Sequence, residues 1–353
     1  MDKRILIINP FGIGDVLFST PLVSAVKEKY PGCHIGYICN IRTKDVLETN
    51  PGVDEVFVFE RDEYRVLWKE SKTKALKKLF NFWKEIRKRR FDLLLDLSLG
   101  KEYAFFCWLS GIKARRGFDY KGRGRFLTYR IPFEGFNDKP VVEYYLDAIL
   151  EWPKGKALNT VLVTTDSDQQ YVDDFLKKQG IKESDVLIGV APGGGASYGK
   201  DRSHYKRWPC KDFAMVSDMI VSRRGKPVLL GSPLEEGLLK EVASKMHNKP
   251  LFSPKTRIRE MSCLINRCKT VLCNDGGLLH VAVSQGVPTV SIFGPTDENV
   301  YGPYPASEKH IVMKSNVDCR PCYKRFRLPE CTTKRCMEDL SADTVFNTLS
   351  KFI

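Results

Sequence analysis

The chain has 353 residues, of which 42% are hydrophobic and 28% are charged, and its formal net charge is +14. This length exceeds the ~250–300 residues that a single core usually serves, so two domains are expected. The composition is that of an ordinary globular protein, so disorder is not the expectation. No apolar run approaches the ~20 residues that cross a bilayer and the N-terminus lacks a signal-peptide cleavage site, so we expect a cytosolic protein.

The first half of the chain alternates short apolar runs with helical patterns. This alternation is typical of a parallel sheet that helices cover on both faces, so the first half is predicted to be Rossmann-like. The expected strands are Arg4–Asn9, Ile35–Cys39, Glu55–Phe59 and Asp92–Leu97, and the expected helices are Val16–Lys29, Leu67–Arg90 and Val141–Trp152.

A glycine-containing turn follows the first predicted strand, with Gly12 and Gly14 just before Asp15. The third glycine of a dinucleotide fingerprint is missing, because Leu17 stands three residues after Gly14. A carboxylate at a helix start would repel a pyrophosphate, so the turn suits a catalytic base better than a phosphate site. Taken alone, the pattern also fits Asp15 as a simple helix cap, and that interpretation is favoured until the later motifs are considered.

The segment from Arg65 to Arg90 carries eleven Lys and Arg residues against two Glu residues, a local net charge of +9. Apolar side chains, Trp68 and Trp83 among them, are interleaved with the charges, which predicts a basic amphipathic helix or helix pair. One interpretation is a solvated surface. The other, favoured by the aromatic residues, is a surface that meets an anionic membrane leaflet or a phosphorylated glycolipid.

The second half repeats the alternation after a polar stretch at residues 164–168, which opens a helix ending near Gly180. We therefore predict an α/β chain of two Rossmann-like domains, residues 1–165 and 166–353, with a ligand cleft outside the carboxyl ends of their strands. The expected strands are Val186–Ala191, Pro227–Gly231, Thr270–Cys273 and Thr289–Phe293, and the expected helices are Trp208–Arg224, Leu234–Met246, Arg259–Arg267 and Leu278–Gln285.

Two loops of the second half are candidates for binding phosphate. Three glycines lie between Ala191 and Ser197 and are followed by the cations Lys206 and Arg207. The segment 274–280, NDGGLLH, places a helix start and a histidine directly after a strand, where free backbone N–H groups bind phosphate oxygens. The alternatives are a flexible loop with solvated cations and a histidine satisfied in the core.

Several motifs occur in order along the chain: GIGDVLFSTPLVSAVKEKYP, PGGGASYG with KRWP, NDGGLLHVAVSQGVPTVSIFGPTDENVYGP, and CRPCYKR with RCMEDLS. With these motifs the chain resembles glycosyltransferase family 9, the ADP-heptose:lipopolysaccharide heptosyltransferases, nearly end to end. The resemblance implies a GT-B fold, with parallel sheets facing across a cleft, an N-terminal acceptor domain and a C-terminal nucleotide-sugar domain. It also implies a last helix, about residues 341–353, that can pack back on the first domain.

The resemblance assigns roles to single residues. It implies Asp15 as general base, with Gly12 and Gly14 in the acceptor-side turn. The family usually has Ser or Thr where Gly276 stands, so one hydroxyl contact to the donor is missing here. The donor-binding residues that it implies are Lys206, Ser197, Asp275, Gly276, Gly277, His280 and, as the ribose-binding acid, Glu235.

The implied reaction is an inverting transfer of heptose, or a related sugar, from an ADP-sugar to a lipopolysaccharide core or lipid A-type acceptor. ADP-heptose is the expected donor, no cofactor is required, and no DxD motif suggests a divalent metal. We expect a monomer at the cytosolic face of the inner membrane that binds this nucleotide-sugar and an anionic glycolipid.

Two other functions fit part of the pattern. A GT-B sugar-nucleotide epimerase would share the donor loops without needing Asp15. A basic nucleic-acid-binding protein would fit the net charge, but the sequence shows no base-reading module, so no nucleic acid partner is expected.

Four of the eleven cysteines lie close together, at Cys319, Cys322, Cys331 and Cys336. Their number suits a Cys₄ zinc site, although the second spacing is shorter than in common zinc ribbons. Reduced thiols or a structural clip are favoured over zinc. The other seven are expected to be reduced core thiols, as in most cytosolic proteins.

Overall fold

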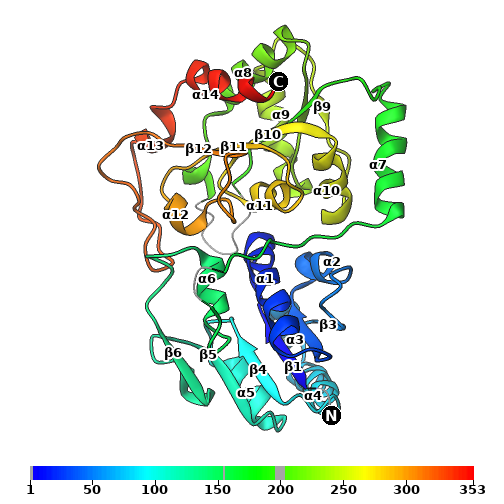
Figure 1. The fold of residues 1–353 in the computed structure, drawn as a ribbon, viewed down its shortest axis with the longest axis vertical. Helices are drawn as coiled ribbons and strands as arrows, with labels where there is room; N and C mark the ends of the chain where they lie inside the picture. The colour runs from blue at the N-terminus through cyan, green and yellow to red at the C-terminus, as the bar shows by residue number, and fades with distance from the viewer. Residues whose placement is uncertain (1–2, 154–155, 195–202) are drawn as a thin grey trace. The chain divides into compact units, whose positions relative to one another are not determined.

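The structure of the protein, a computed structural model, describes residues 3–153, 156–194 and 203–353. It divides the chain into two compact units (Figure 1). Unit 1 comprises Met1–Gly135 and Val141–Val161, and unit 2 comprises Phe136–Pro140 and Leu162–Ile353. Each unit contains one six-stranded sheet in which all paired strands are parallel, so the predicted α/β class is confirmed.

Unit 1 has the strand order β3-β2-β1-β4-β5-β6. The four predicted strands are confirmed within one or two residues, whereas two further strands at the end of the sheet were not predicted. The strands are β1 (Arg4–Ile8), β2 (His34–Cys39), β3 (Glu55–Val58), β4 (Leu93–Asp96), β5 (Ala114–Tyr120) and β6 (Tyr129–Phe133). The helices are α1 (Ile13–Lys29), α2 (Lys44–Leu47), α3 (Arg61–Glu70), α4 (Lys72–Lys88), α5 (Glu102–Leu109) and α6 (Val141–Leu146).

The basic segment of unit 1 forms the helix pair α3 and α4, which confirms that prediction. The pair is interrupted at Ser71, whose hydroxyl caps α4 by accepting from the Lys74 N–H at 3.4 Å. On the inner side, Trp83 and Ile86 of α4 pack on the sheet residues Leu6 and Ile8. Along the sheet, the crossover from β1 to β2 moves in the opposite direction to the crossover from β3 to β4. Because such crossovers are right-handed, α1 lies on the face of the sheet opposite to α4.

Unit 2 has the strand order β12-β11-β10-β7-β8-β9. The four predicted strands are confirmed, and the short edge strands β9 and β12 were not predicted. The strands are β7 (Leu187–Ala191), β8 (Lys226–Leu229), β9 (Leu251–Phe252), β10 (Cys268–Asn274), β11 (Thr289–Ile292) and β12 (His310–Met313). The helices are α7 (Asp166–Lys178), α8 (Cys210–Ser222), α9 (Glu236–Ser244), α10 (Ile258–Asn266), α11 (Gly277–Ser284), α12 (Glu298–Tyr301), α13 (Arg335–Glu338) and α14 (Ala342–Leu349).

The last helix, α14, belongs to unit 2. Its apolar residues Val345, Phe346 and Leu349 are buried in one cluster with Phe213 and Ile220 of α8. Within unit 2 the apolar face of α14 is therefore buried against α8, and the packing of this helix on the first domain stays a prediction.

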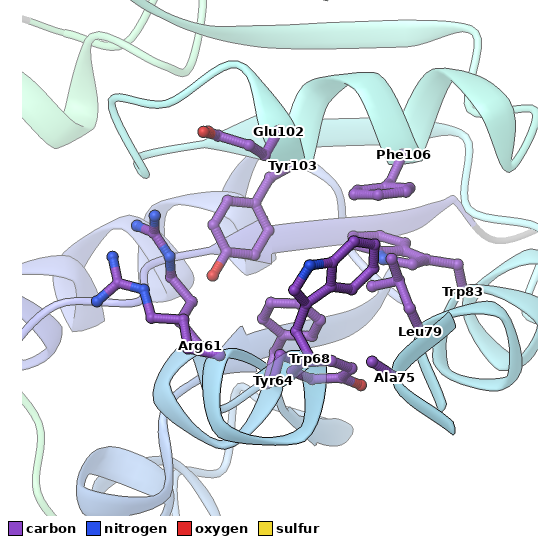
Figure 2. A pocket seen from close by; sticks show the side chains of 11 residues that line it. Arg61, Tyr64, Trp68, Ala75, Leu79, Trp83, Glu102, Tyr103 and Phe106 are labelled. Carbon is purple, nitrogen blue, oxygen red and sulfur yellow. The ribbon is translucent and has the colours of Figure 1, made fainter. Parts of the chain in front are cut away.

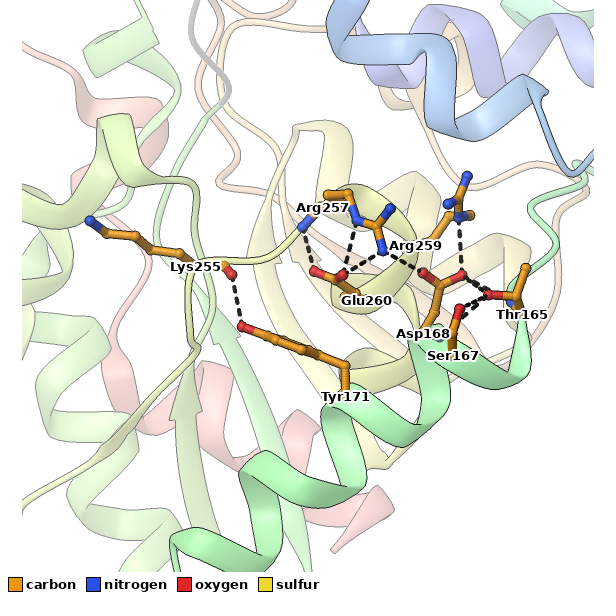
Figure 3. A network of polar contacts seen from close by, with 8 residues as sticks. All are labelled: Thr165, Ser167, Asp168, Tyr171, Lys255, Arg257, Arg259 and Glu260. Carbon is orange, nitrogen blue, oxygen red and sulfur yellow. Dashed lines mark hydrogen bonds and ion pairs between the residues drawn. The ribbon is translucent and has the colours of Figure 1, made fainter.

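An ion-pair network joins the start of α7 to the start of α10 (Figure 3). The fully buried carboxylate of Asp168 accepts from Arg259 Nε at 3.0 Å and from Arg257 Nη2 at 3.2 Å. It also accepts from the backbone N–H and the hydroxyl of Thr165, the helix cap, at 2.9 and 2.7 Å. Burial alone would raise the pKa of Asp168, but the Thr165 hydrogen bonds and the Arg259 charge lower it below the ordinary value. The network therefore anchors α7 through a carboxylate that stays ionised.

Candidate active site

Both sheets reverse their strand order beside the first strand of the unit, between β1 and β4 in unit 1 and between β7 and β10 in unit 2. In open α/β sheets, ligands bind outside the carboxyl ends of the strands at such switch points. Asp15 follows β1 in unit 1, and in unit 2 the residues 192–194 and 275–277 follow β7 and β10. The motifs picked out from the sequence thus lie where this fold class binds ligands.

Asp15 occupies the first turn of α1 in unit 1. Its carboxylate accepts from the Gly12 N–H at 3.2 Å and its side chain remains half-buried rather than enclosed. Gly12 is the helix cap and Gly14 the second residue of α1, and the backbone at Gly12 is extended, with φ −76° and ψ 178°. Asp15 therefore does cap its helix, and the same geometry leaves the carboxylate at the carboxyl edge of the sheet.

Two buried asparagines hold the turn before Asp15. Asn9 accepts from the Phe11 N–H at 3.2 Å and donates to the Asp15 carbonyl at 3.1 Å. Asn40 donates to the carbonyls of Pro10 and Phe11 at 3.0 and 2.5 Å. Because both ends of the turn are hydrogen-bonded, the position of Asp15 is fixed by its neighbours.

A second carboxylate lies at the carboxyl end of β4, beside β1. Asp96 is only 3% exposed, and burial raises its pKa to about 6 although hydrogen bonds from Ser98 oppose the rise. Asp96 could not be selected from the sequence, because an acid at the end of an apolar strand resembles an ordinary strand terminus.

In unit 2 the carboxylate of Asp275 lies at the centre of a polar cluster. Lys206 Nζ is 2.8 Å from Asp275 Oδ2, and the Thr296 hydroxyl donates to the same oxygen at 2.7 Å. Burial alone would raise the pKa of Asp275, but the Lys206 charge and the hydrogen bonds lower it. The ammonium of Lys206 also lies 5.6 Å from the ring centre of Tyr323. An ionised acid thus positions a half-buried cation at this sheet edge.

His280 projects from α11 and is 5% exposed. Burial lowers its pKa to about 4; the charge of Asp275 opposes this shift and that of Lys206 adds to it. The imidazole is therefore neutral at pH 7, and the same helix begins at Gly277 with Gly276 as its cap. The predicted grouping of Asp275, Gly276, Gly277, His280 and Lys206 is present in the structure.

Asn274 connects the separate motifs of this cluster. Its side-chain amide donates to the Pro192 carbonyl at 2.8 Å, and its oxygen accepts from the Trp208 N–H at 3.1 Å. The glycine loop also approaches Glu235, since a Cβ at Gly193 would lie 2.0 Å from Glu235 Oε1. Glu235 accepts from the Ser232 N–H at 2.9 Å. A larger residue at position 193 would have to displace the Glu235 carboxylate, so the loops after β7 and β8 meet there.

Beside these loops lies a cavity of about 310 Å³. Its walls come from the ends of β8 and β9 and from α9, and they include Gly231, Leu239 and Phe252 as well as the cations Lys240 and Lys255. An apolar cavity of this size beside polar groups suits a small organic ligand.

Other predicted site residues have different outcomes. Ser197 lies outside the residues that the structure describes. The four clustered cysteines are free thiols. Burial raises the pKa of Cys336 to about 11, and the neighbouring Cys319, Cys322 and Cys331 add to this rise. Within residues 3–153, 156–194 and 203–353, no group of three or more His, Cys, Asp or Glu side chains is arranged to hold a metal ion. No helix in these ranges is long and apolar enough to cross a membrane.

Sequence reasoning missed the residues that support the cluster from the loop after β11. Thr296 is fully buried on Asp275, and Arg320 donates to the carbonyls of Gly294 and Thr296 at 3.0 and 3.3 Å. Arg320 also pairs with Glu298 at 2.8 Å. The motif FGPTD starts at the end of the predicted strand Thr289–Phe293, but nothing in its pattern indicated that a cation 24 residues after Thr296 would hold the loop.

Comparisons with known proteins agree with this architecture. Residues 79–332 match the family model described as Glycosyltransferase family 9 (heptosyltransferase). The chain is 26% identical over 322 residues to lipooligosaccharide heptosyltransferase 2 of Haemophilus influenzae, covering 88% of each. It aligns with a solved glycosyltransferase family 9 structure from Veillonella parvula at TM-score 0.82 and 23% identity, covering 99% of this chain and 97% of that one. ADP-heptose lps heptosyltransferase II of E. coli aligns at TM-score 0.77 and 21% identity, covering 99% and 98%. These likenesses confirm the predicted GT-B fold class.

Proposed function

Because the chain belongs to glycosyltransferase family 9 and is therefore a glycosyltransferase, we propose that it transfers heptose, or a related sugar, from an ADP-sugar to a lipopolysaccharide core or lipid A-type acceptor. The observation that carries the proposal is the cluster of Lys206, Asp275 and His280 at the switch point of unit 2. It combines a positioned cation, a neutral imidazole and a helix N-terminus, the groups that a diphosphate needs.

The donor is proposed to bind to unit 2. Its diphosphate would contact Lys206 and the backbone N–H groups at the start of α11, and its nucleoside would occupy the cavity beside Gly231 and Phe252. Glu235 is near enough to the glycine loop to accept a hydrogen bond from the ribose. The structurally similar E. coli protein is an ADP-heptose lps heptosyltransferase, which supports ADP-heptose as the donor.

The chemistry is proposed to be a single displacement with inversion. An acceptor hydroxyl attacks the anomeric carbon, the bond from that carbon to the diphosphate oxygen breaks, and the hydroxyl proton passes to the Asp15 carboxylate. A positioned carboxylate contributes ~10²–10⁴-fold as a general base. Lys206 and the amides of α11 take up the charge of the departing diphosphate, which supports transfer without a metal cofactor.

The acceptor is proposed to be an anionic glycolipid at the cytosolic face of the inner membrane. The α3–α4 pair supports this, because most of its Lys and Arg side chains are exposed and each basic residue near an anionic surface adds about 1 kcal/mol of attraction. We propose that the enzyme works as a monomer in peripheral contact with that membrane.

The proposal is tested by mixing the purified protein with ADP-heptose and measuring released ADP with and without a core-type acceptor. Transfer requires that ADP release depend on the acceptor and that the product gain one heptose by mass spectrometry. Acceptor-independent conversion of the donor sugar would instead identify a sugar-nucleotide epimerase. No ADP release with any acceptor would refute the donor assignment.

A further inference from the structure

A second cavity, of about 260 Å³, lies in unit 1 among α3, α4 and α5 (Figure 2). Its walls are mainly aromatic and aliphatic and include Phe59, Trp68, Leu79, Trp83 and Phe106. The rings of Trp83 and Phe106 are stacked, with their centres 5.1 Å apart and their planes 13° from parallel. A cavity with such walls suits an apolar ligand.

Two hydrogen-bond donors in the cavity wall have no partner among the residues that the structure describes. The indole N–H of Trp83 and the hydroxyl of Tyr103 are buried, and within the described part of the chain neither forms a hydrogen bond. The two side chains are only 6% and 4% exposed, and their rings are 6.5 Å apart. Buried polar groups are normally satisfied, so this pair indicates a ligand that brings acceptor oxygens.

Cationic side chains stand at one end of the same cavity. Arg61 and Arg65 both line it, and in Figure 2 the Tyr103 hydroxyl points to the side on which the Arg61 guanidinium lies. Arg65 pairs with the neighbouring Asp62 at 3.2 Å, whereas no described carboxylate pairs with Arg61. Glu102 also lines the cavity, so its charged lining residues are two arginines against one carboxylate. Because the cations are in excess, the ligand is expected to be apolar along most of its length and anionic at one end.

The surface around the cavity has the same mixed character. Val66, Trp68, Leu76 and Phe80 of α3 and α4 are 57%, 47%, 52% and 67% exposed. They alternate with the lysines of the basic segment, so apolar and cationic side chains share one helix pair. Helices with this composition lie in the interface of anionic membranes.

We propose that this cavity holds one acyl chain of an anionic membrane lipid. The chain lies against Trp68, Leu79 and Phe106, its ester oxygens accept from Tyr103 and Trp83, and its headgroup contacts Arg61 and Arg65. This inference rests on the membrane contact proposed above and deepens it, because it replaces adsorption to lipid headgroups by capture of a single lipid.

The first experiment uses soluble probes. Calorimetry with monomeric 1-lauroyl-lysophosphatidylglycerol should show binding to the full chain, and glycerol phosphate, which lacks the acyl chain, should bind at least about tenfold more weakly. Tyr103→Phe removes one unsatisfied donor, so its melting temperature should equal or exceed that of the parent, while its affinity for the lysolipid should fall about three- to tenfold. Tyr171→Phe, which removes a hydroxyl bonded to the Lys255 carbonyl in unit 2, is the matched control and should bind as the parent does.

The second experiment uses vesicles of phosphatidylglycerol with brominated acyl chains, which should quench the fluorescence of Trp68 and Trp83. Vesicle binding without quenching, or lysolipid affinity unchanged in Tyr103→Phe, would overturn the acyl-chain site and leave headgroup adsorption intact. Absence of binding to phosphatidylglycerol vesicles would overturn the membrane contact as well. Acceptor-dependent ADP release is measured separately, and it shows whether the proposed transfer holds when the acyl-chain site or the membrane contact fails.

Discussion

Replacing Lys206 with Met separates the structural from the functional role of the donor cluster. Lys206 and Thr296 are the two side chains described on the Asp275 carboxylate, and the change leaves only Thr296. Asp275 is 5% exposed, so the carboxylate stays buried. Breaking a buried ion pair costs about 3–5 kcal/mol. Because the Lys206 side chain is itself 24% exposed, we expect a smaller loss, about 2–3 kcal/mol. Without the ammonium, burial raises the pKa of Asp275, so the loss should shrink as the pH is lowered from 7 towards 5 and the carboxyl is protonated.

The double variant Lys206→Met/Asp275→Asn removes both charges, and its stability should return to within about 1 kcal/mol of the parent. Its affinity for ADP should stay about 10–100-fold weaker, because the cation is absent. Urea unfolding of the unit 2 transition and calorimetry with ADP measure the two effects, and Lys211→Met, an exposed lysine on α8, is the control. A single variant as stable as the parent, or a double variant that binds ADP normally, would refute this reasoning.

Three further outcomes are expected. Asp15→Asn keeps an oxygen that can cap α1, but the amide cannot take up a proton. The transfer rate should therefore fall ~10²–10⁴-fold while the ADP dissociation constant stays unchanged. Normal turnover would contradict the assignment of Asp15 as the base. His280 keeps a pKa of about 4 when folded, below the ordinary 6.5, so its contribution to stability is complete above pH 6.5 and is lost as the pH falls towards 4. Thermal unfolding from pH 7 to 4 should show a loss of about 3 kcal/mol that His280→Gln lacks; equal pH profiles would count against the buried neutral imidazole. Arg259→Ala should destabilise unit 2 by about 3 kcal/mol, because it removes a buried partner of the fully buried Asp168. Arg257→Ala should cost only about 1 kcal/mol, because the Arg257 side chain is 53% exposed. Equal losses of stability in urea titrations would show that burial does not decide the difference.

Most of the strands that could be predicted are short runs of buried apolar residues, and β3, with the sequence EVFV, is the half-buried exception. β5, with the sequence ARRGFDY, was missed because its charges resemble a loop. In the structure Arg115 is buried and donates to the carbonyls of Phe126 and Lys113 at 2.6 and 2.9 Å. These hydrogen bonds offset the cost of burying the guanidinium. The order of strands within each sheet cannot be read from their alternation along the chain.

The same limit applies to the candidate site. The loops around Lys206 and Asp275 could be selected because glycines and helix starts after strands have a local signature. Their ion pair, across 69 residues, could not be predicted, because it exists only where β7 and β10 become neighbours. The role of Arg320 and the unsatisfied donors of Trp83 and Tyr103 depend on packing between elements, which leaves no pattern in the sequence.

The assignment of Phe136–Pro140 to unit 2 affects how the protein can be divided. Phe136 meets the rings of Tyr301 and Phe326 edge-on at 6.3 and 5.5 Å, although the chain on either side of this five-residue segment belongs to unit 1. A gene fragment that starts at Leu162 would omit these aromatic contacts, and a fragment that ends at Val161 would carry the segment without its partners. Separate expression of the halves should therefore begin from a circularly permuted or co-expressed chain rather than from one cut.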